Sequence, residues 1–396
     1  MSEPTRTAAP TSPVPRPPPA AVPTSSGDRR SVAGRNRELY IDAFRGLMAL
    51  VMVQGHVFDD LVSAAARADR LYQFQVIFHG STAPGFLFAS GFVAGLPRAP
   101  LSLRASLRRA RRLLFVLGTG YFLNLPYLSL WKTLARATPA EKAALFACNP
   151  LQLIAVTQLA VLLLQWIAGR RWVIVSAAGA LAVLVAGPFV WASGLSTRLP
   201  PFLAAYIDPS VAPSQFPIFP FASFVLAGTA AGAWLGRTER RTRRRRAMRA
   251  ALVLVAAGGL VSLALSGRVD FWTVSPGYAL LRLGALMLVL VAVEGACLRA
   301  ARLMRHLALL GHETLLVYVL HLVILFGGVL GHSPLLDDQG KMGFGDAAVV
   351  LAAMLPVLYG AAWAWHRMKT GQPHMARLAL TYVTVLVVWE FLTRPW

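Results

Sequence analysis

Three ionisable side chains, Asp42, Arg45 and His56, share one face of the first hydrophobic segment. Arg45 and His56 are eleven positions apart, and a rotation of about 100° per residue returns the second to within roughly 20° of the first. Asp42 precedes Arg45 by three residues and lies on the same face. Histidine supplies a base that titrates near neutral pH, and arginine supplies a fixed positive charge. Ionisable groups inside a membrane span are costly unless paired or wet, so this pattern predicts a functional site.

Histidines in two other apolar segments are further candidates. His79 opens the second segment and, like His56, is expected towards its outer end, so the two can meet across a helical hairpin. Thr314, Tyr318 and His321 share a face of the ninth segment at i, i+4 and i+7. Interhelical hydrogen bonds explain such a stripe equally well, because membrane bundles use them widely.

Arg282 lies about four residues inside the eighth segment. It either extends towards the interface or binds an anionic substrate. No spacing typical of a metal site is present, and no glycine-rich phosphate loop or nucleophile elbow is found. We therefore predict a site without metal, formed by side chains of several spans.

The composition places these segments in a membrane. Of the 396 residues, 56% are hydrophobic and 14% are charged, whereas a soluble domain carries about 25% charged residues. Apolar runs long enough to cross a bilayer recur along the chain. The sequence predicts an all-α, polytopic bundle of about eleven transmembrane helices, within a range of ten to twelve. The expected spans cover residues 41–62, 74–96, 113–131, 150–168, 172–193, 217–236, 250–267, 277–297, 307–330, 346–365 and 377–393.

The net charge of +22 follows the positive-inside rule. Arginine clusters occur in alternate loops between the spans. If the N-terminus is cytoplasmic, most of the basic residues therefore lie on the cytoplasmic side. This asymmetry predicts an odd number of spans with the C-terminus outside. We expect contact with anionic lipid rather than with nucleic acid.

The ends of the chain and its cysteines add little chemistry. Residues 1–38 are rich in Pro, Ser, Ala and Arg and are expected to form a disordered cytoplasmic tail. Residues 39–396 are expected to form a single transmembrane domain. Cys148 and Cys297 fall on opposite sides of the membrane in this topology, so they cannot form a disulfide.

Three motifs resemble the transmembrane acyltransferase superfamily. Asp42-x-Phe44-Arg45-Gly46 is followed by His56, and an arginine, ten residues and a histidine are the signature of the acyltransferase type 3 branch. The segment from Phe78 to Gly91, with His79 and Pro84, is more similar to bacterial relatives of heparan-α-glucosaminide N-acetyltransferase. The segment from Gly311 to His321 is similar to the late-helix motif of both branches. We assign the chain to the heparan-acetyltransferase-like branch, with the type 3 branch as the alternative.

This resemblance implies transfer of an acyl group, usually acetyl, from cytoplasmic acyl-CoA to a glycan or lipid-linked acceptor. His56, His79 and His321 are then the catalytic candidates, and either of the first two carries the chemistry as base or acyl carrier. Arg45 with Asp42 is expected to hold phosphate or pantetheine. Tyr318 and Arg282 are also expected to bind substrate.

Several expectations about surroundings follow. We expect a bacterial inner (plasma) membrane, the lipid bilayer as partner, and acetyl-CoA or another acyl-CoA as co-substrate. A homodimer is possible. The alternative function is a transporter or flippase for a lipid-linked or anionic sugar, with Arg45, His56 and Arg282 lining its path.

Overall fold

The computed structural model describes residues 26–97, 102–327 and 331–394, with side chains from Leu39 onward. Contacts divide the chain into residues 1–37 and 38–396, and the bundle described below is the second unit. Helix α1 (Ser26–Leu61) begins inside the segment that the sequence predicts to be a disordered tail. Residues 1–25 of that segment lie outside the described residues.

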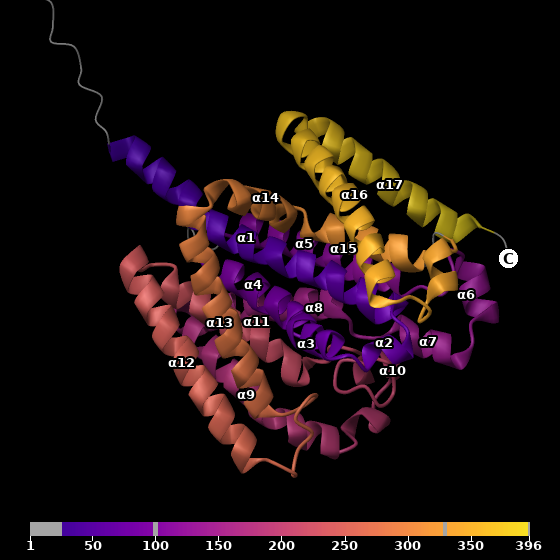
Figure 1. Cartoon of the computed structure of the whole chain (residues 1–396), viewed down its shortest axis with the longest axis horizontal. Helices are drawn as coiled ribbons and strands as arrows, with labels where there is room; N and C mark the ends of the chain where they lie inside the picture. The colour runs from indigo at the N-terminus through magenta and orange to yellow at the C-terminus, as the bar shows by residue number, and fades with distance from the viewer. Residues whose placement is uncertain (1–25, 98–101, 328–330, 395–396) are drawn as a thin grey trace, which may run out of the picture. The chain divides into compact units, whose positions relative to one another are not determined.

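The regular elements of the described residues are helices (Figure 1). After α1 they are α2 (Ala64–Arg67), α3 (Arg70–His79), α4 (Thr82–Gly95), α5 (Leu103–Leu123), α6 (Leu130–Arg136), α7 (Pro139–Leu145), α8 (Pro150–Ile167), α9 (Trp172–Ala192), α10 (Pro201–Ala204), α11 (Ile218–Leu235), α12 (Arg240–Ala264), α13 (Pro276–Arg299), α14 (Ala301–His312), α15 (Thr314–Phe326), α16 (Phe344–Gly371) and α17 (Pro373–Thr393). The predicted all-α polytopic membrane bundle is confirmed.

The described residues contain fewer candidate spans than the eleven expected. Nine helices are long and apolar enough to cross a membrane, or ten if the bent pair α14 and α15 is one span. The span expected at 113–131 is displaced, because the helix there, α5, covers Leu103–Leu123, and the five arginines of its first half exclude it from these nine. The span expected at 307–330 is broken near Glu313, where α14 and α15 meet at a 74° bend.

Helices α4 and α11 approach each other closely through paired glycines. A Cβ added to Gly91 of α4 would lie 1.9 Å from the carbonyl oxygen of Val225. On the other side, a Cβ added to Gly228 of α11 would lie 2.1 Å from the carbonyl oxygen of Phe88. Small residues four apart let helix backbones touch where no hydrophobic effect drives association in lipid. This contact forms the rigid centre against which α1 is placed.

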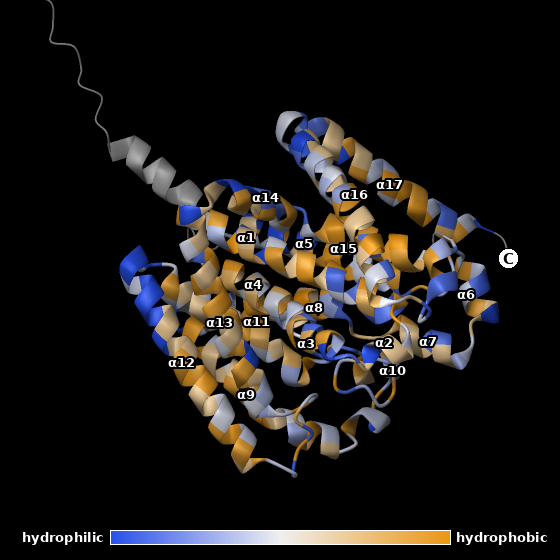
Figure 2. Ribbon diagram, viewed as in Figure 1, coloured by the Kyte–Doolittle hydropathy of each residue, from blue (hydrophilic) through white to orange (hydrophobic). Residues whose placement is uncertain are grey.

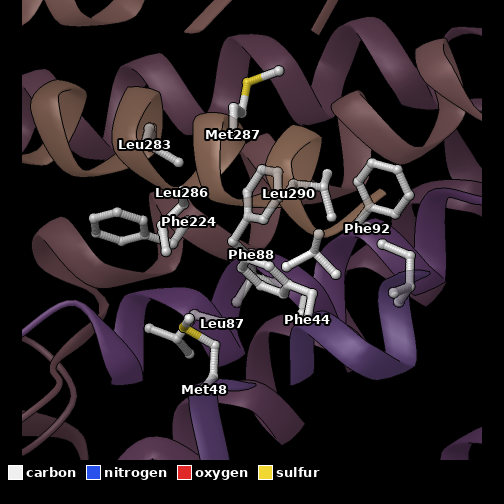
Figure 3. Close-up of a cluster of buried hydrophobic side chains, with 14 of the residues drawn as sticks. Phe44, Met48, Leu87, Phe88, Phe92, Phe224, Leu283, Leu286, Met287 and Leu290 are labelled. Atoms are coloured by element: carbon white, nitrogen blue, oxygen red, sulfur yellow. The ribbon is translucent and has the colours of Figure 1, made fainter. Parts of the chain in front are cut away.

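The main core lies where α1, α4, α11 and α13 meet (Figure 3). Phe44 and Met48 of α1 pack there with Phe88 of α4 and Leu286 of α13. A second buried cluster holds other residues of α1, from Ala49 to Leu61, against α15 and α16. Since α1 is packed on two sides, its polar face is fixed in direction. That face carries the ionisable side chains identified in the sequence.

Candidate functional site

His56 of α1 and His321 of α15 are directly joined. His56 Nδ1 lies 2.8 Å from His321 Nε2, and the two rings stack with their centroids 5.0 Å apart. His321 is fully buried, and its Nδ1 lies 2.9 Å from the carbonyl oxygen of Val317 in the preceding turn. The two residues are 265 positions apart, so their pairing depends on the packing of α1 against α15.

The hydrogen bonds fix which nitrogens carry protons when both rings are neutral. The Val317 carbonyl only accepts, so His321 Nδ1 must donate to it and His321 Nε2 must accept. His56 Nδ1 then donates to His321. His56 Nε2 is consequently left with a lone pair, as a general base or a nucleophile requires.

His79, at the end of α3, belongs to a second pair. Its Nε2 lies 2.9 Å from a carboxylate oxygen of Asp59, and its ring centroid is 5.6 Å from that of His56. Tyr72 and Gln75 of α3 donate to the other oxygen of Asp59 at 2.9 and 3.3 Å. Asp59 is therefore held in place from α3 and aligns the His79 ring beside His56.

A glycine permits this approach of α3 to α1. A Cβ added to Gly55 would lie 1.6 Å from His79 Nδ1, so the imidazole occupies the space that a side chain would fill. His79 Nδ1 is buried and has no hydrogen-bond partner among the described residues. The polar contact of His79 is thus made through Nε2, which makes Asp59 the residue that fixes its orientation.

Arg45 lies one and a half turns into the apolar part of α1, beside the break between α14 and α15. Its guanidinium donates to Thr314 Oγ1 at 2.7 Å and to Asp42 Oδ1 at 3.4 Å. Asp42 also faces His312 at 3.6 Å. Glu313, at the break itself, is buried and pairs with His366 and Lys369 of α16. At this end of the site, opposite His79, each acidic side chain therefore lies beside basic side chains that balance its charge.

One cavity of about 590 Å³ joins these groups. Four of the seven predicted site residues line it, namely Arg45, His56, His79 and Tyr318. The unpredicted Asp59 lines it as well. Its remaining walls are largely apolar and come from α4, α5, α8, α15 and the loop before α11.

The other three predicted residues, Asp42, Arg282 and His321, do not line the cavity but lie next to residues that do. His321 contacts His56 and Asp42 contacts Arg45, as described above. Arg282 of α13 donates to the hydroxyl of Tyr278 at 2.7 Å and stacks over that ring at 3.9 Å. Its Nη2 would lie 3.2 Å from a Cβ on Gly80, which lines the cavity. Arg282 is thus one residue away from the space rather than in its wall.

A smaller hollow of about 260 Å³ adjoins the cavity at the ends of α4, α5 and α8. Ser90 lines both spaces, so they share a wall. Arg109, Arg112 and Gln158 line the smaller hollow. Gln158 donates to the carbonyl oxygen of Ser90 at 2.7 Å, which fixes this wall. The arrangement can hold an elongated molecule with an anionic end at the arginines.

The opposite wall of the cavity is formed by two loops that are tied together. The amide of Phe216 donates to the carbonyl of Cys148 at 3.0 Å, and the amide of Cys148 donates to Ser214 Oγ at 2.8 Å. Burial raises the pKa of the Cys148 thiol, so it stays protonated and donates to the carbonyl of Phe216. These bonds place Gln215, Phe216 and Asn149 in the cavity wall.

Asp59 is the residue that the sequence reasoning missed. It follows His56 by three positions, the same spacing that links Asp42 to Arg45, and this signal could have identified it. Three other polar residues, Asn124, Gln158 and Glu294, make packing hydrogen bonds or ion pairs. Among the described residues, no group of three His, Cys, Asp or Glu side chains is placed to hold a metal ion.

Comparison with known proteins gives one result that covers nearly the whole chain. Residues 38–391 match the model of an acyltransferase domain. No curated protein matches the chain. The matched range includes α1 with Arg45 and His56, and it extends through α15 with His321.

Proposed function

Because the chain belongs to the acyltransferase type 3 family and forms a membrane bundle, it is a membrane acyltransferase, and we propose that acyl-CoA is its donor. The acyl group is most simply acetyl, and the acceptor is a glycan or a lipid-linked molecule. The observation that carries the proposal is the cavity lined by His56, whose Nε2 has an unshared lone pair, and its shared wall at Ser90 with a hollow lined by Arg109 and Arg112.

The donor fits the end of the cavity that carries arginines. The phosphates of a coenzyme A molecule would bind Arg109 and Arg112, since guanidinium groups form strong charge-assisted bonds with phosphate oxygens. The pantetheine chain would pass Ser90 and reach Arg45, whose partners Thr314 and Asp42 keep it oriented. This places the thioester near His56.

The acceptor fits the opposite end of the cavity. Asn149 and Gln215 offer amide groups, and Phe216 offers an aromatic face, a combination that suits a polar ring such as a sugar. Arg282 lies beside Gly80, and within the described residues its guanidinium has only the Tyr278 hydroxyl as hydrogen-bond partner. It would bind an anionic group of the acceptor. Tyr318 lines the space between the two ends.

Two reaction routes use the same atoms. In the direct route, His56 Nε2 takes the proton of the acceptor hydroxyl or amine, which attacks the thioester carbonyl. The carbon–sulfur bond breaks, and the departing thiolate takes the proton from the His56 imidazolium. In the covalent route, His56 Nε2 attacks the thioester first, CoA leaves, and the acceptor then takes the acyl group. His321 holds the required tautomer in both routes, and His79 with Asp59 supplies a second polarising pair.

The setting of the reaction is also part of the proposal. The arginine-lined hollow would face the cytoplasm, the source of acyl-CoA, and the loop that carries Phe216 would face outside. With α5 and the bent pair α14 and α15 crossing in addition to the nine candidate helices, the number of spans is odd, and the N-terminus would lie in the cytoplasm and the C-terminus outside a bacterial inner membrane. The family match supports the type 3 branch, the alternative predicted from the sequence, and no comparison supports the heparan-acetyltransferase-like assignment.

Mass spectrometry of the purified protein after brief incubation with isotopic acetyl-CoA tests the proposal. Wild type is compared with His56→Ala, His79→Ala and, as a control, His332→Ala, whose ring is exposed and does not line the cavity. A label retained by wild type and lost in His56→Ala establishes the covalent route. CoA release that depends on His56 without a retained label establishes the direct route.

A transporter is the second candidate, because one of the spans beside the cavity is broken. Helices α14 and α15 meet at a 74° bend near Glu313, and discontinuous helices often surround substrates in transporters. Absence of both label and CoA release in every protein, with the acyl-CoA still bound, favours this function over acyl transfer.

A further inference from the structure

The first turns of α12 carry arginines that point in two directions. Arg243 is buried, pairs with Glu294 of α13 and lies over the ring of Tyr40 at 5.1 Å. Arg240 approaches the same carboxylate at 3.8 Å. The inward arginines are thus compensated by one acidic residue, which also ties α12 to α13.

The outward arginines surround a separate hollow. It measures about 480 Å³ and is lined by Arg241, Arg244, Arg245, Arg249 and the side chain of Met248. Within the part of the chain that the structure describes, none of these four arginines forms an ion pair. They sit at the N-terminal end of a helix, where the dipole already concentrates positive charge. An anion with several oxygens would relieve this repulsion and accept hydrogen bonds from more than one guanidinium.

The hollow continues into an apolar strip along α12. Arg241, Arg245, Met248 and Leu252 recur every three or four residues and therefore lie on one face. The same face continues to Leu263, and Leu252 and Leu263 are 57% and 76% exposed. A Cβ added to Gly259 on this face would meet nothing within 4 Å. Figure 2 shows the same change along α12, from hydrophilic first turns to a hydrophobic remainder.

We propose that this face of α12 binds one anionic phospholipid, with its phosphate among the four arginines and an acyl chain along Leu252, Gly259 and Leu263. The occupant needs both parts, because the arginines select negative charge and the apolar strip lies within a membrane-spanning helix. A free phosphate satisfies only the first requirement. The site is separate from the cavity around His56, since the two share no lining residue.

Native mass spectrometry of the solubilised full chain tests this site with phosphatidylglycerol and phosphatidylcholine of identical acyl chains. Wild type is expected to bind one phosphatidylglycerol in preference to phosphatidylcholine. The double variant Arg241→Gln with Arg245→Gln is expected to lose roughly thirtyfold in affinity for phosphatidylglycerol, because two basic side chains no longer face the phosphate.

The control removes two exposed arginines outside the hollow, Arg246→Gln with Arg104→Gln, and is expected to keep wild-type affinity. Equal binding of the two lipids by wild type overturns the proposal whatever the variants do. Equal losses in the hollow and control variants overturn it as well, because they would show a general charge effect. Displacement of the lipid by inorganic phosphate at an equal concentration would identify a phosphate site rather than a lipid site.

Discussion

At the scale of single residues, the site rests on two imidazoles with different supports. His56 is oriented by another imidazole, His321, which is itself tied to the backbone of its helix. His79 is oriented by the carboxylate of Asp59, which Tyr72 also contacts. The first arrangement leaves a free lone pair on His56, whereas the second directs Nε2 of His79 towards a carboxylate. The two rings therefore suit different tasks although they touch.

The carboxylate of Asp59 can be tested by replacing it with the amide of the same shape. Asp59→Asn keeps an oxygen for the His79 N–H but removes the negative charge, so acyl transfer is expected to fall roughly tenfold or more. The readout is CoA release from acetyl-CoA, with thermal unfolding measured in parallel. Asp337→Asn serves as control, because Asp337 makes an exposed pair with His332 at 3.1 Å. Equal activity in wild type and Asp59→Asn would remove Asp59 from the site.

Gly55→Ala tests the contact between α1 and His79. The added methyl group would lie 1.6 Å from His79 Nδ1, so the ring must leave its place beside His56. We expect acyl transfer to be lost while the protein still folds. Gly360→Ala in α16 is the control, because a Cβ added there meets nothing within 4 Å. Replacing a glycine in the middle of a helix by alanine is expected to raise the stability by about 0.5–1 kcal/mol. Activity is measured with acetyl-CoA in detergent, and an active Gly55→Ala protein would contradict the observed packing.

Sequence alone identified the residues that share a helix and the approach of His79 to His56, whose ring centroids are 5.6 Å apart, but not the other partners of the site. The stripe of Asp42, Arg45 and His56 follows from helical periodicity, which needs no tertiary information. The bond between His56 and His321 joins positions 265 apart, and only the packing of α1 against α15 determines it. Asp59 was overlooked because an acidic residue near the end of a span is also common at the interface.

At the scale of elements, hydropathy predicts where helices lie better than where they break. The apolar runs that became α8, α11 and α13 are close to their expected limits. The amphipathic α5 was misplaced because its arginines occupy the half of the helix that precedes the apolar run. The bend at Glu313 was missed because the ion pairs that hold it come from α16, which is distant in the sequence.

The close contact of α4 with α11 gives a prediction at this scale. Gly228→Ala would place a methyl carbon 2.1 Å from the carbonyl oxygen of Phe88, so the two helices must separate. We expect a loss of about 1–3 kcal/mol in stability, as for other overpacked sites. Gly118→Ala in α5 is the control, since a Cβ there has open space. Thermal unfolding in detergent measures both, and unchanged stability of Gly228→Ala would show that this contact is adjustable.

At the scale of the whole unit 38–396, the cavity has two chemically different ends. Arg109 and Arg112 mark the smaller hollow beside it, and the loop with Gln215 and Phe216 forms its other wall. A transfer across the bilayer requires these ends to face different compartments. The charge pattern of the loops predicts which compartment each end faces, so the orientation of the chain links the sequence to the mechanism.

Cysteine labelling tests this orientation directly. In a Cys148→Ser, Cys297→Ser background, exposed single cysteines are introduced as Thr242→Cys at the arginine-rich end of α12 and Ser210→Cys in the loop before α11. A membrane-impermeant maleimide added to spheroplasts is expected to label Ser210→Cys alone, and inverted vesicles are expected to give the reverse pattern. Labelling of Thr242→Cys from the outside would reverse the proposed orientation of the bundle. The hollow lined by Arg109 and Arg112 would then lie away from the cytoplasmic pool of acyl-CoA. Such a result would require the donor to enter by the other end of the cavity.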